Sequence, residues 1–166
     1  MYYIAILALV GLDWLTKYWI QTSMALNDTI PVIDGIFHIT YIHNYGAAFS
    51  ILQGKQSFLL NVTGIAMAAI LGYMVIAQIR KKAHSLELWS LTLILAGGIG
   101  NFIDRVRLGY VVDFFDFRVW PIFNVADIAV CCGCGLLVLY VLILEPRMEK
   151  KAKEEEVLKT SAEQEA

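Results

Sequence analysis

Long apolar runs, separated by shorter polar segments, dominate the chain. They predict four membrane-spanning helices, over residues of about 1–20, 58–79, 86–103 and 128–145. A hydrocarbon core of about 30 Å takes roughly 17–25 helical residues, which the first, second and fourth runs provide. The third run is apolar only over 88–102, so it spans the membrane only if its polar end, 101–105, reaches the interface. The pattern therefore favours a bundle of four transmembrane helices.

The first apolar run also has to be compared with a cleavable secretory signal peptide. Such a peptide has a basic amino-terminal region and a small-residue cleavage site. This run has neither, and it carries Asp13 and Lys17 in its interior. We therefore expect a permanent helix.

The connections on one side of the predicted bundle are rich in aromatic and β-branched residues. Segments 36–43 and 110–119 have the composition of short strands, and Gly and Pro residues interrupt the chain around them. We expect an α-helical integral membrane protein with a small β-rich platform on one surface. It forms a single domain over 1–146, followed by a charged tail over 147–166.

The distribution of Lys and Arg predicts how the bundle is oriented. Eight of them lie in the 80–82 connection and after the fourth span, against four in the two longer connections. Because basic residues are enriched in cytoplasmic segments, both termini should lie in the cytoplasm and the β-rich platform outside.

The composition supports a membrane protein and excludes two other classes. Of the residues, 58% are hydrophobic and 17% charged, against about 45–50% and about 25% in soluble domains. The chain has 13 basic and 15 acidic residues, and this charge balance excludes nucleic-acid binding by bulk electrostatics. Cys131, Cys132 and Cys134 lie too close together for a disulfide framework, and with no further Cys or His nearby they do not suit a zinc site. We expect them to be small packing residues.

Several charged residues fall inside the apolar spans, where each costs roughly 2.5–3.5 kcal/mol at the bilayer centre. Asp13 and Lys17 are four residues apart and share a helix face, so they form either a self-neutralising pair that packs the bundle or part of a functional site. A second stripe, in the third span, comprises Gly97, Asn101, Asp104 and Arg105. Small residues beside it allow close helix approach, but packing alone does not explain three polar residues on one face.

Two acidic segments lie at the outer ends of the spans. Asp113 and Asp116 are three residues apart in an expected strand, so they point to opposite faces, and one can face solvent while the other faces the bundle. Asn124 and Asp127 have the spacing of a helix cap with an acid in the first turn. If Asp113 and Asp127 converge, they share a proton, and such a pair can activate water and protonate a carbonyl or a leaving amine. This is the chemistry of aspartic peptide hydrolysis.

Other chemistry is less well supported by the sequence. There is no G-x-S-x-G, H-E-x-x-H or Walker motif. His38 and His43 have an odd spacing in an expected strand, so they should lie on opposite faces and share no metal, while His84 belongs to the basic connection. Asn44 with Gly46 either closes a turn or approaches a ligand.

Five short motifs follow one another along the chain: D-W-L-T-K at 13–17, N-Y-G-A-A-F at 44–49, G-G-I-G-N-F-I-D-R at 97–105, V-V-D-F at 111–114 and F-N-V-A-D at 123–127. Together, on a four-span frame of this length, they resemble the bacterial lipoprotein signal peptidases (signal peptidase II). The resemblance implies an aspartic endopeptidase that removes the signal peptide of diacylglyceryl-modified prolipoproteins, cutting before the lipidated cysteine. It also implies a site at the outer face of the bacterial cytoplasmic membrane, contact with membrane lipids and sensitivity to the cyclic peptide globomycin.

The same resemblance assigns roles by position. Asp113 and Asp127 are the catalytic pair, and the short interval between them makes the loop that joins them compact. Residues around the substrate are Asn44, Gly97, Asn101, Arg105 and Asn124, and those with a structural role are Asp13, Lys17 and Asp104. Asp116 lies outside the motifs. An aspartic pair needs only water, so we expect no cofactor and no metal, and nothing in the chain requires more than a monomer.

Other functional classes make different demands on the same residues. A transporter or proton conductor should carry polar groups through the full depth of the bundle, whereas the second span has no charge and the fourth has none beyond Asp127. A non-catalytic assembly protein would leave substitutions of Asp113 and Asp127 nearly silent. A hydrolase of lipid phosphates would need a denser cluster of His and Arg than this chain offers.

Overall fold

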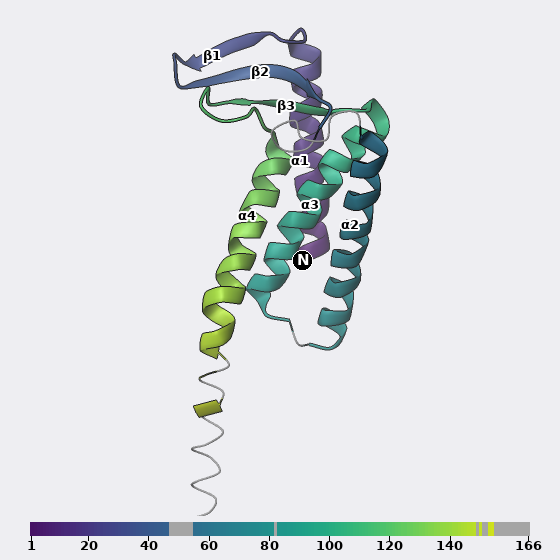
Figure 1. Ribbon diagram of the computed structural model, residues 1–166, viewed down its shortest axis with the longest axis vertical. Helices are drawn as coiled ribbons and strands as arrows, with labels where there is room; N and C mark the ends of the chain where they lie inside the picture. Colours follow the sequence, from purple (N-terminus) through teal and green to yellow (C-terminus); the bar gives the residue numbers. More distant parts are fainter. Residues whose placement is uncertain (47–54, 82, 149, 151–152, 155–166) are drawn as a thin grey trace, which may run out of the picture.

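The computed structural model describes residues 1–46, 55–81, 83–148, 150 and 153–154. Four long helices form a bundle, and a small sheet covers one end of it (Figure 1). In chain order the elements are α1 (Tyr2–Ser23), β1 (Thr29–Ile33), β2 (Phe37–Asn44), α2 (Gln56–Ile79), α3 (Ser85–Leu108), β3 (Val111–Asp116), α4 (Val125–Leu139) and the π-helical turn η2 (Tyr140–Leu144). The predicted fold class, four helices with a small β-rich platform, is confirmed.

All four helices are long and apolar enough to cross a membrane, with α4 and η2 forming part of one span, Val125–Met148. The third span is 24 residues long because α3 continues through its polar stripe to Leu108. It ends at Gly109, whose φ of 80° gives the left-handed cap that glycine adopts without strain. The polar stripe therefore occupies the last turns of α3, beside the sheet.

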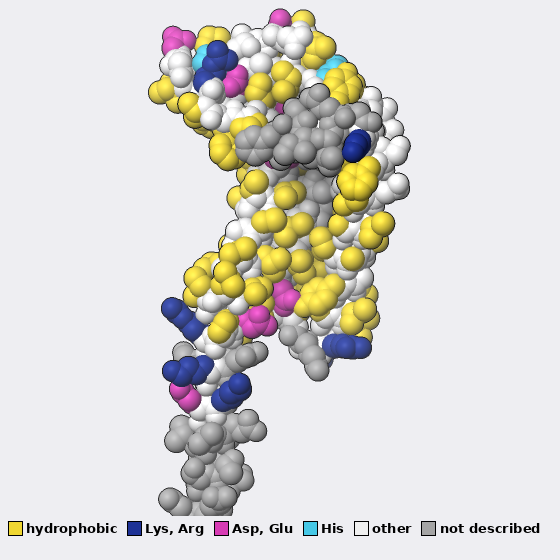
Figure 2. All heavy atoms as spheres, viewed as in Figure 1, with side chains coloured by type: hydrophobic (Ala, Val, Ile, Leu, Met, Phe, Trp, Pro, Cys, Tyr) yellow, Lys and Arg dark blue, Asp and Glu magenta, His cyan; other side chains and the backbone are white. Residues whose placement is uncertain are grey.

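The outer surface of the helices is apolar, as a lipid solvent requires. Side chains such as Ile4, Leu7, Ile65 and Ile79 are each more than 70% exposed. Figure 2 shows hydrophobic side chains along the bundle, with Lys and Arg near both of its ends. In water such a surface would be an aggregation hazard, whereas in a bilayer it is the contact with the acyl chains.

The centre of the bundle is α3, which packs against each of the other three helices. Its contact with α4 depends on glycines. A Cβ on Gly133 would lie 2.7 Å from the carbonyl oxygen of Ser90, and a Cβ on Gly97 would overlap the carbonyl oxygen of Ala126. The two backbones therefore approach more closely than any larger residue allows.

The three cysteines of α4 do not take part in this contact. Gly133 is buried against α3, while Cys131, Cys132 and Cys134 around it are exposed on the apolar surface of the bundle. The prediction that they are packing residues is wrong, because the face of α4 that meets α3 is lined by glycine and leaves the thiols on the lipid side.

The sheet is antiparallel in the order β1-β2-β3. Strands β2 and β3 lie against the end of the bundle. A small apolar cluster joins it to the carboxyl-terminal end of α1 and comprises Ile20, Tyr41, Val112 and Phe114. This packing fixes β3, the strand that carries Asp113, against the helices.

A β-bulge in β2 changes which side chains share a face of the sheet. Just before Ile42, β2 has one residue more than β3, and Ile42 then pairs with Asp113. The added residue shifts the alternation of side chains, so His38 and His43 lie on the same face, opposite to that of Asp113. The prediction of opposite faces for the two histidines is wrong because spacing in the sequence does not show a bulge.

Candidate active site

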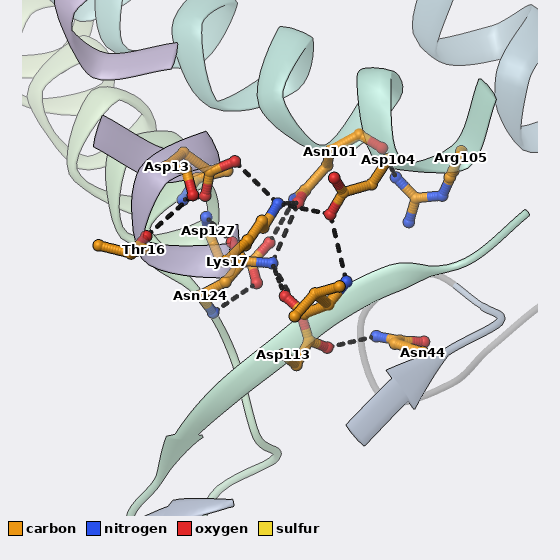
Figure 3. Close-up of polar contacts among 12 residues, drawn as sticks. Asp13, Thr16, Lys17, Asn44, Asn101, Asp104, Arg105, Asp113, Asn124 and Asp127 are labelled. Carbon is orange, nitrogen blue, oxygen red and sulfur yellow. Dashed lines mark hydrogen bonds and ion pairs between the residues drawn. The ribbon is translucent and has the colours of Figure 1, made fainter. Parts of the chain in front are cut away.

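Two carboxylates from different elements come together where the sheet meets the bundle (Figure 3). Asp113 projects from β3 and is only 1% exposed, whereas Asp127, in the first turn of α4, is half-buried. Asn124 contacts both: its Nδ2 donates to Asp113 Oδ1 at 2.7 Å, and its backbone N–H donates to Asp127 Oδ2 at 3.1 Å. The two carboxylates thus flank a single asparagine.

The amino terminus of α4 holds Asp127 in place. Asn124 Oδ1 accepts from the backbone N–H of Asp127 at 3.0 Å, which completes a capping box with the bond just described. Asp13, from α1, accepts from the backbone N–H of Ala126 at 2.9 Å. The helix-cap interpretation of Asn124 and Asp127 is confirmed, and the same cap residue carries the contact to Asp113.

The loop between the two aspartates is tied back onto β3. The carbonyl oxygen of Phe123 accepts from the N–H groups of Phe114 and Phe115, at 3.0 and 2.8 Å. Because Phe123 directly precedes Asn124, this pairing sets the helix cap beside β3. The compact connection that the sequence predicts therefore brings the two carboxylates to one place.

Asp113 lies in surroundings that favour its neutral form. Burial and the negative charge of Asp127 raise the pKa of Asp113 from its ordinary 3.8 to about 7, against the lowering effect of two hydrogen bonds. Those bonds come from Nδ2 of Asn124, at 2.7 Å, and Nδ2 of Asn44, at 2.9 Å. Near neutral pH Asp113 therefore holds a proton for about half of the time.

A buried ion cluster lies next to the carboxylates. Lys17 is 1% exposed, and its Nζ lies 2.8 Å from Asp13 Oδ2 and 2.9 Å from Asp104 Oδ2. It also donates to Asn101 Oδ1 at 2.9 Å, and Asn101 Nδ2 donates to Asp127 Oδ1 at 2.8 Å. The pair that the sequence predicts within α1 exists, but it also extends across to α3.

Arg105 faces the site with part of its hydrogen-bonding capacity unused. Its Nη2 donates to the carbonyl oxygen of Gly46 at 2.9 Å, while its Nε is buried and has no partner among the described residues. That contact brings the start of the 44–49 motif to α3; residues 47–49 of the motif lie outside the described residues. Leaving a buried N–H without a hydrogen bond costs free energy, so the Nε–H of Arg105 is available to donate to an oxygen of a bound ligand.

A groove opens beside Asp127 and Arg105. Its volume is about 260 Å³, and it lies between α2, α3 and α4. The remaining lining residues are Thr63, Ala66, Met67, Ile70, Ile94, Gly98, Asn101 and Val130. One end is polar, at the carboxylate, and the rest is apolar.

The contribution of α2 to this groove was missed by the sequence analysis. The second span contains no charge, so nothing in it points to chemistry; its only cue is the spacing of Thr63, Ala66 and Ile70 on one helical face. Gly98 lines the groove, whereas Gly97 is buried at the contact with α4. A direct contact between Gly97 and substrate stays a prediction.

Asp116 lies on the other face of β3, away from the carboxylate pair. It is 4% exposed, and it accepts from Thr40 Oγ1 at 2.8 Å and from Arg118 Nη1 at 3.0 Å. Burial raises its pKa, but the bonds from Thr40 and Arg118 outweigh this and hold the pKa below its ordinary value. The expectation that one of the two strand aspartates faces solvent is wrong, because Asp116 is buried and forms hydrogen bonds with Thr40 of β2 and with Arg118.

Comparison with known proteins places the chain among bacterial membrane peptidases. The family model "Signal peptidase (SPase) II" matches residues 5–143. The lipoprotein signal peptidase of Halothermothrix orenii is 39% identical over 141 residues, which are 85% of this chain and 94% of the relative. That of Streptococcus thermophilus is 48% identical over 141 residues, 82% and 88% of the two chains.

Two solved structures, both described as a bacterial membrane enzyme, share the fold. One superposes with a TM-score of 0.78 at 35% identity, covering 85% of this chain and 87% of the other. The second has a TM-score of 0.73 at 33% identity, covering 86% and 93%.

Proposed function

The chain belongs to the signal peptidase II family and is a multi-pass membrane peptidase that processes the signal peptides of prolipoproteins; we propose that it does so as an aspartic endopeptidase with Asp113 and Asp127 as catalytic residues. The observation that carries the proposal is the pairing of a buried carboxyl with a pKa of about 7 and a second carboxylate, joined by one asparagine. This is the asymmetry that acid–base hydrolysis of a peptide bond needs.

In the proposed mechanism the two carboxyl groups take different roles. Asp127, which accepts N–H bonds from Asn101 and Asn124 in the first turn of α4, acts as the base. It takes a proton from water as the water attacks the scissile carbonyl carbon. Asp113 gives its proton to the carbonyl oxygen. When the tetrahedral intermediate collapses, the C–N bond breaks and Asp127 gives its proton to the leaving nitrogen. A hydroxyl proton of the intermediate returns to Asp113 as the carboxylic acid product forms, which restores the pair.

The groove supports a membrane-embedded substrate. Its apolar length, from Gly98 to Ile70, suits the hydrophobic residues of a signal peptide, and its polar end places a peptide bond beside Asp127. The unpartnered Nε of Arg105 can bind a backbone carbonyl there, with Asn44 nearby on Asp113. A diacylglyceryl group on the following cysteine would stay in the bilayer, so the cut falls before the lipidated cysteine.

We place the sheet and the carboxylates at the outer face of the bacterial cytoplasmic membrane, with both termini inside. Arg80 follows the last residue of α2 and Arg147 lies in the last turn of the fourth span, and these helix ends lie away from the sheet (Figure 1). Basic residues at this end are expected for a cytoplasmic surface. The enzyme acts as a monomer without a cofactor, and globomycin-type cyclic peptides inhibit it.

The proposal is tested by cleavage of a diacylglyceryl-modified prolipoprotein beside the same precursor without lipid, in detergent or lipid vesicles. We expect the lipidated precursor to be cut directly before its modified cysteine and the unlipidated precursor to remain intact. Equal cleavage of both precursors would contradict the role of the lipid. No cleavage by folded enzyme would favour the transporter or assembly alternatives.

The elevated pKa of Asp113 predicts the alkaline limb of the pH profile. The general acid must be protonated, so kcat/KM should be constant below about pH 7 and fall about tenfold per pH unit above it. The measurement is initial cleavage rate from pH 5 to 9, with thermal unfolding at each pH to show that the enzyme stays folded. Activity that stays constant up to pH 9 would exclude Asp113 as the proton donor.

A further inference from the structure

The three asparagines around the carboxylates each have their side-chain amide held in one orientation. The oxygen of Asn44 faces the backbone N–H of Gly46 at 2.9 Å, and the oxygen of Asn124 faces the backbone N–H of Asp127 at 3.0 Å. The oxygen of Asn101 faces Nζ of Lys17 at 2.9 Å. Backbone N–H groups and ammonium groups only donate, so each amide must present its oxygen to them and its NH₂ to the other side.

As a result, the carboxylates receive only N–H donors from these amides. The NH₂ groups of Asn44 and Asn124 donate to Asp113, and that of Asn101 donates to Asp127 (Figure 3). If any of the three amides turned over, its oxygen would face a carboxylate oxygen. Such a contact destabilises the ionised carboxylate and removes a hydrogen bond.

Asn101 differs from the other two in how its orientation is fixed. Asn44 and Asn124 are held by backbone groups two and three residues away. Asn101 is held by a side chain from another helix, Lys17 on α1, which is 84 residues distant in the sequence. Its oxygen also lies 3.0 Å from Nδ2 of Asn124, but that nitrogen makes its shortest bond, 2.7 Å, to Asp113. The charge-assisted bond from Lys17 is therefore the stronger constraint.

We propose that Lys17 is a positioning residue of the catalytic pair: it holds the amide of Asn101 in the orientation that donates to Asp127. Its ammonium has three N–H bonds and three acceptors, Asp13, Asp104 and Asn101, so it has no freedom to turn away. The inference rests on the proposed catalytic role of Asp127. It goes beyond a structural role, in which Lys17 would only neutralise Asp13 and Asp104.

The charges of the cluster allow these two roles to be separated. Asp13, Asp104 and Lys17 together carry one net negative charge. Lys17→Met changes the net charge of the cluster from one negative charge to two. This variant therefore combines two effects, the loss of the N–H donor and the added negative charge. The double substitution Lys17→Met/Asp104→Asn restores one net negative charge, and the new amide keeps an oxygen for the N–H of Val112, which Asp104 now bonds at 3.2 Å. In the double variant the net charge is restored, and the N–H donors from Lys17 to Asn101 and Asp13 are missing.

The test compares wild type, Lys17→Met, Asp104→Asn and the double variant in cleavage of the lipidated precursor. We expect kcat to fall about tenfold in Lys17→Met and equally in the double variant, with KM unchanged. Removing a hydrogen-bond donor from a catalytic site costs about 10²–10³-fold in kcat. Without Lys17 the amide of Asn101 is still present but free to turn, so the loss should be smaller. Asp104→Asn should keep kcat within about threefold. Thermal unfolding in the same detergent reports the structural cost of each change separately.

The split between kcat and KM is the readout that a structural role would not move. Both variants that lack Lys17 should lose kcat with KM unchanged, whereas a purely structural role would lower thermal stability without this split. Recovery of kcat in the double variant would overturn the proposal. Failure of the proposed function looks different, since Asp113→Asn and Asp127→Asn would then retain activity.

Discussion

Asp113→Asn and Asp127→Asn should each lower kcat for the lipidated precursor by about 10²–10⁴-fold, the range that general acid–base catalysis contributes. Asparagine can neither hold the proton that Asp113 gives to the carbonyl oxygen nor accept the proton that Asp127 takes from water. Because binding is made mainly by the groove, KM should change little. The measurement is single-turnover cleavage, in which the chemical step is not masked by product release.

The matched control for this prediction is Asp116→Asn, on the same strand as Asp113. Asp116 is equally buried, but its partners are Thr40 and Arg118 on the other face of the sheet. We expect cleavage within about threefold of wild type and some loss of thermal stability. Comparable loss of activity in Asp116→Asn and Asp113→Asn would mean that the sheet, and not the carboxylate pair, is what the substitutions disturb.

Among the Gly→Ala substitutions in α3, each of which adds one methyl group, Gly97→Ala should destabilise the protein most. The new Cβ overlaps the carbonyl oxygen of Ala126 and lies 2.7 Å from Cγ2 of Val130, so α3 and α4 must move apart. Overpacking of this kind costs about 1–3 kcal/mol in a well-packed interior, and here the obstacle is backbone that cannot rotate away. We expect the free energy of unfolding to fall by about 3 kcal/mol.

The same displacement should also impair catalysis, because Asp127 lies one residue beyond Ala126 and depends on Asn101 across the contact. Gly135→Ala is the control: no atom of the part of the chain that the structure describes lies within 4 Å of its new Cβ, and it is on the same helix as Asp127. It should leave activity unchanged and raise stability by about 0.5–1 kcal/mol, the helix preference of alanine over glycine. Unfolding in detergent that leaves Gly97→Ala as stable as wild type would contradict the close packing.

The helices could be predicted from the sequence because a bilayer imposes one strong condition. A span must be about 20 residues long and apolar, and four segments of this chain satisfy that requirement without any tertiary information. The candidate pair could be predicted for a similar reason. A carboxylate such as Asp113, among valines and phenylalanines, has few structural explanations.

What the sequence could not show depends on contacts between distant elements. The bulge in β2 places His38 and His43 on one face, and it exists only as a mismatch in pairing with β3. Asp104 and Lys17 are far apart in the chain, so their ion pair is visible only once α1 packs against α3. The groove was hidden because α2 contributes small and apolar side chains, which sequence alone does not distinguish from lipid-facing ones.

The division of the two carboxylates between a strand and a helix has a consequence for biogenesis. Insertion of the four helices delivers Asp127 to the membrane surface but leaves Asp113 on a segment that must still pair with β2 and accept the amide of Asn124. The proposed catalytic pair is therefore complete only where the sheet is folded onto the bundle. A chain whose sheet has not formed lacks the geometry that brings Asp113 to Asp127.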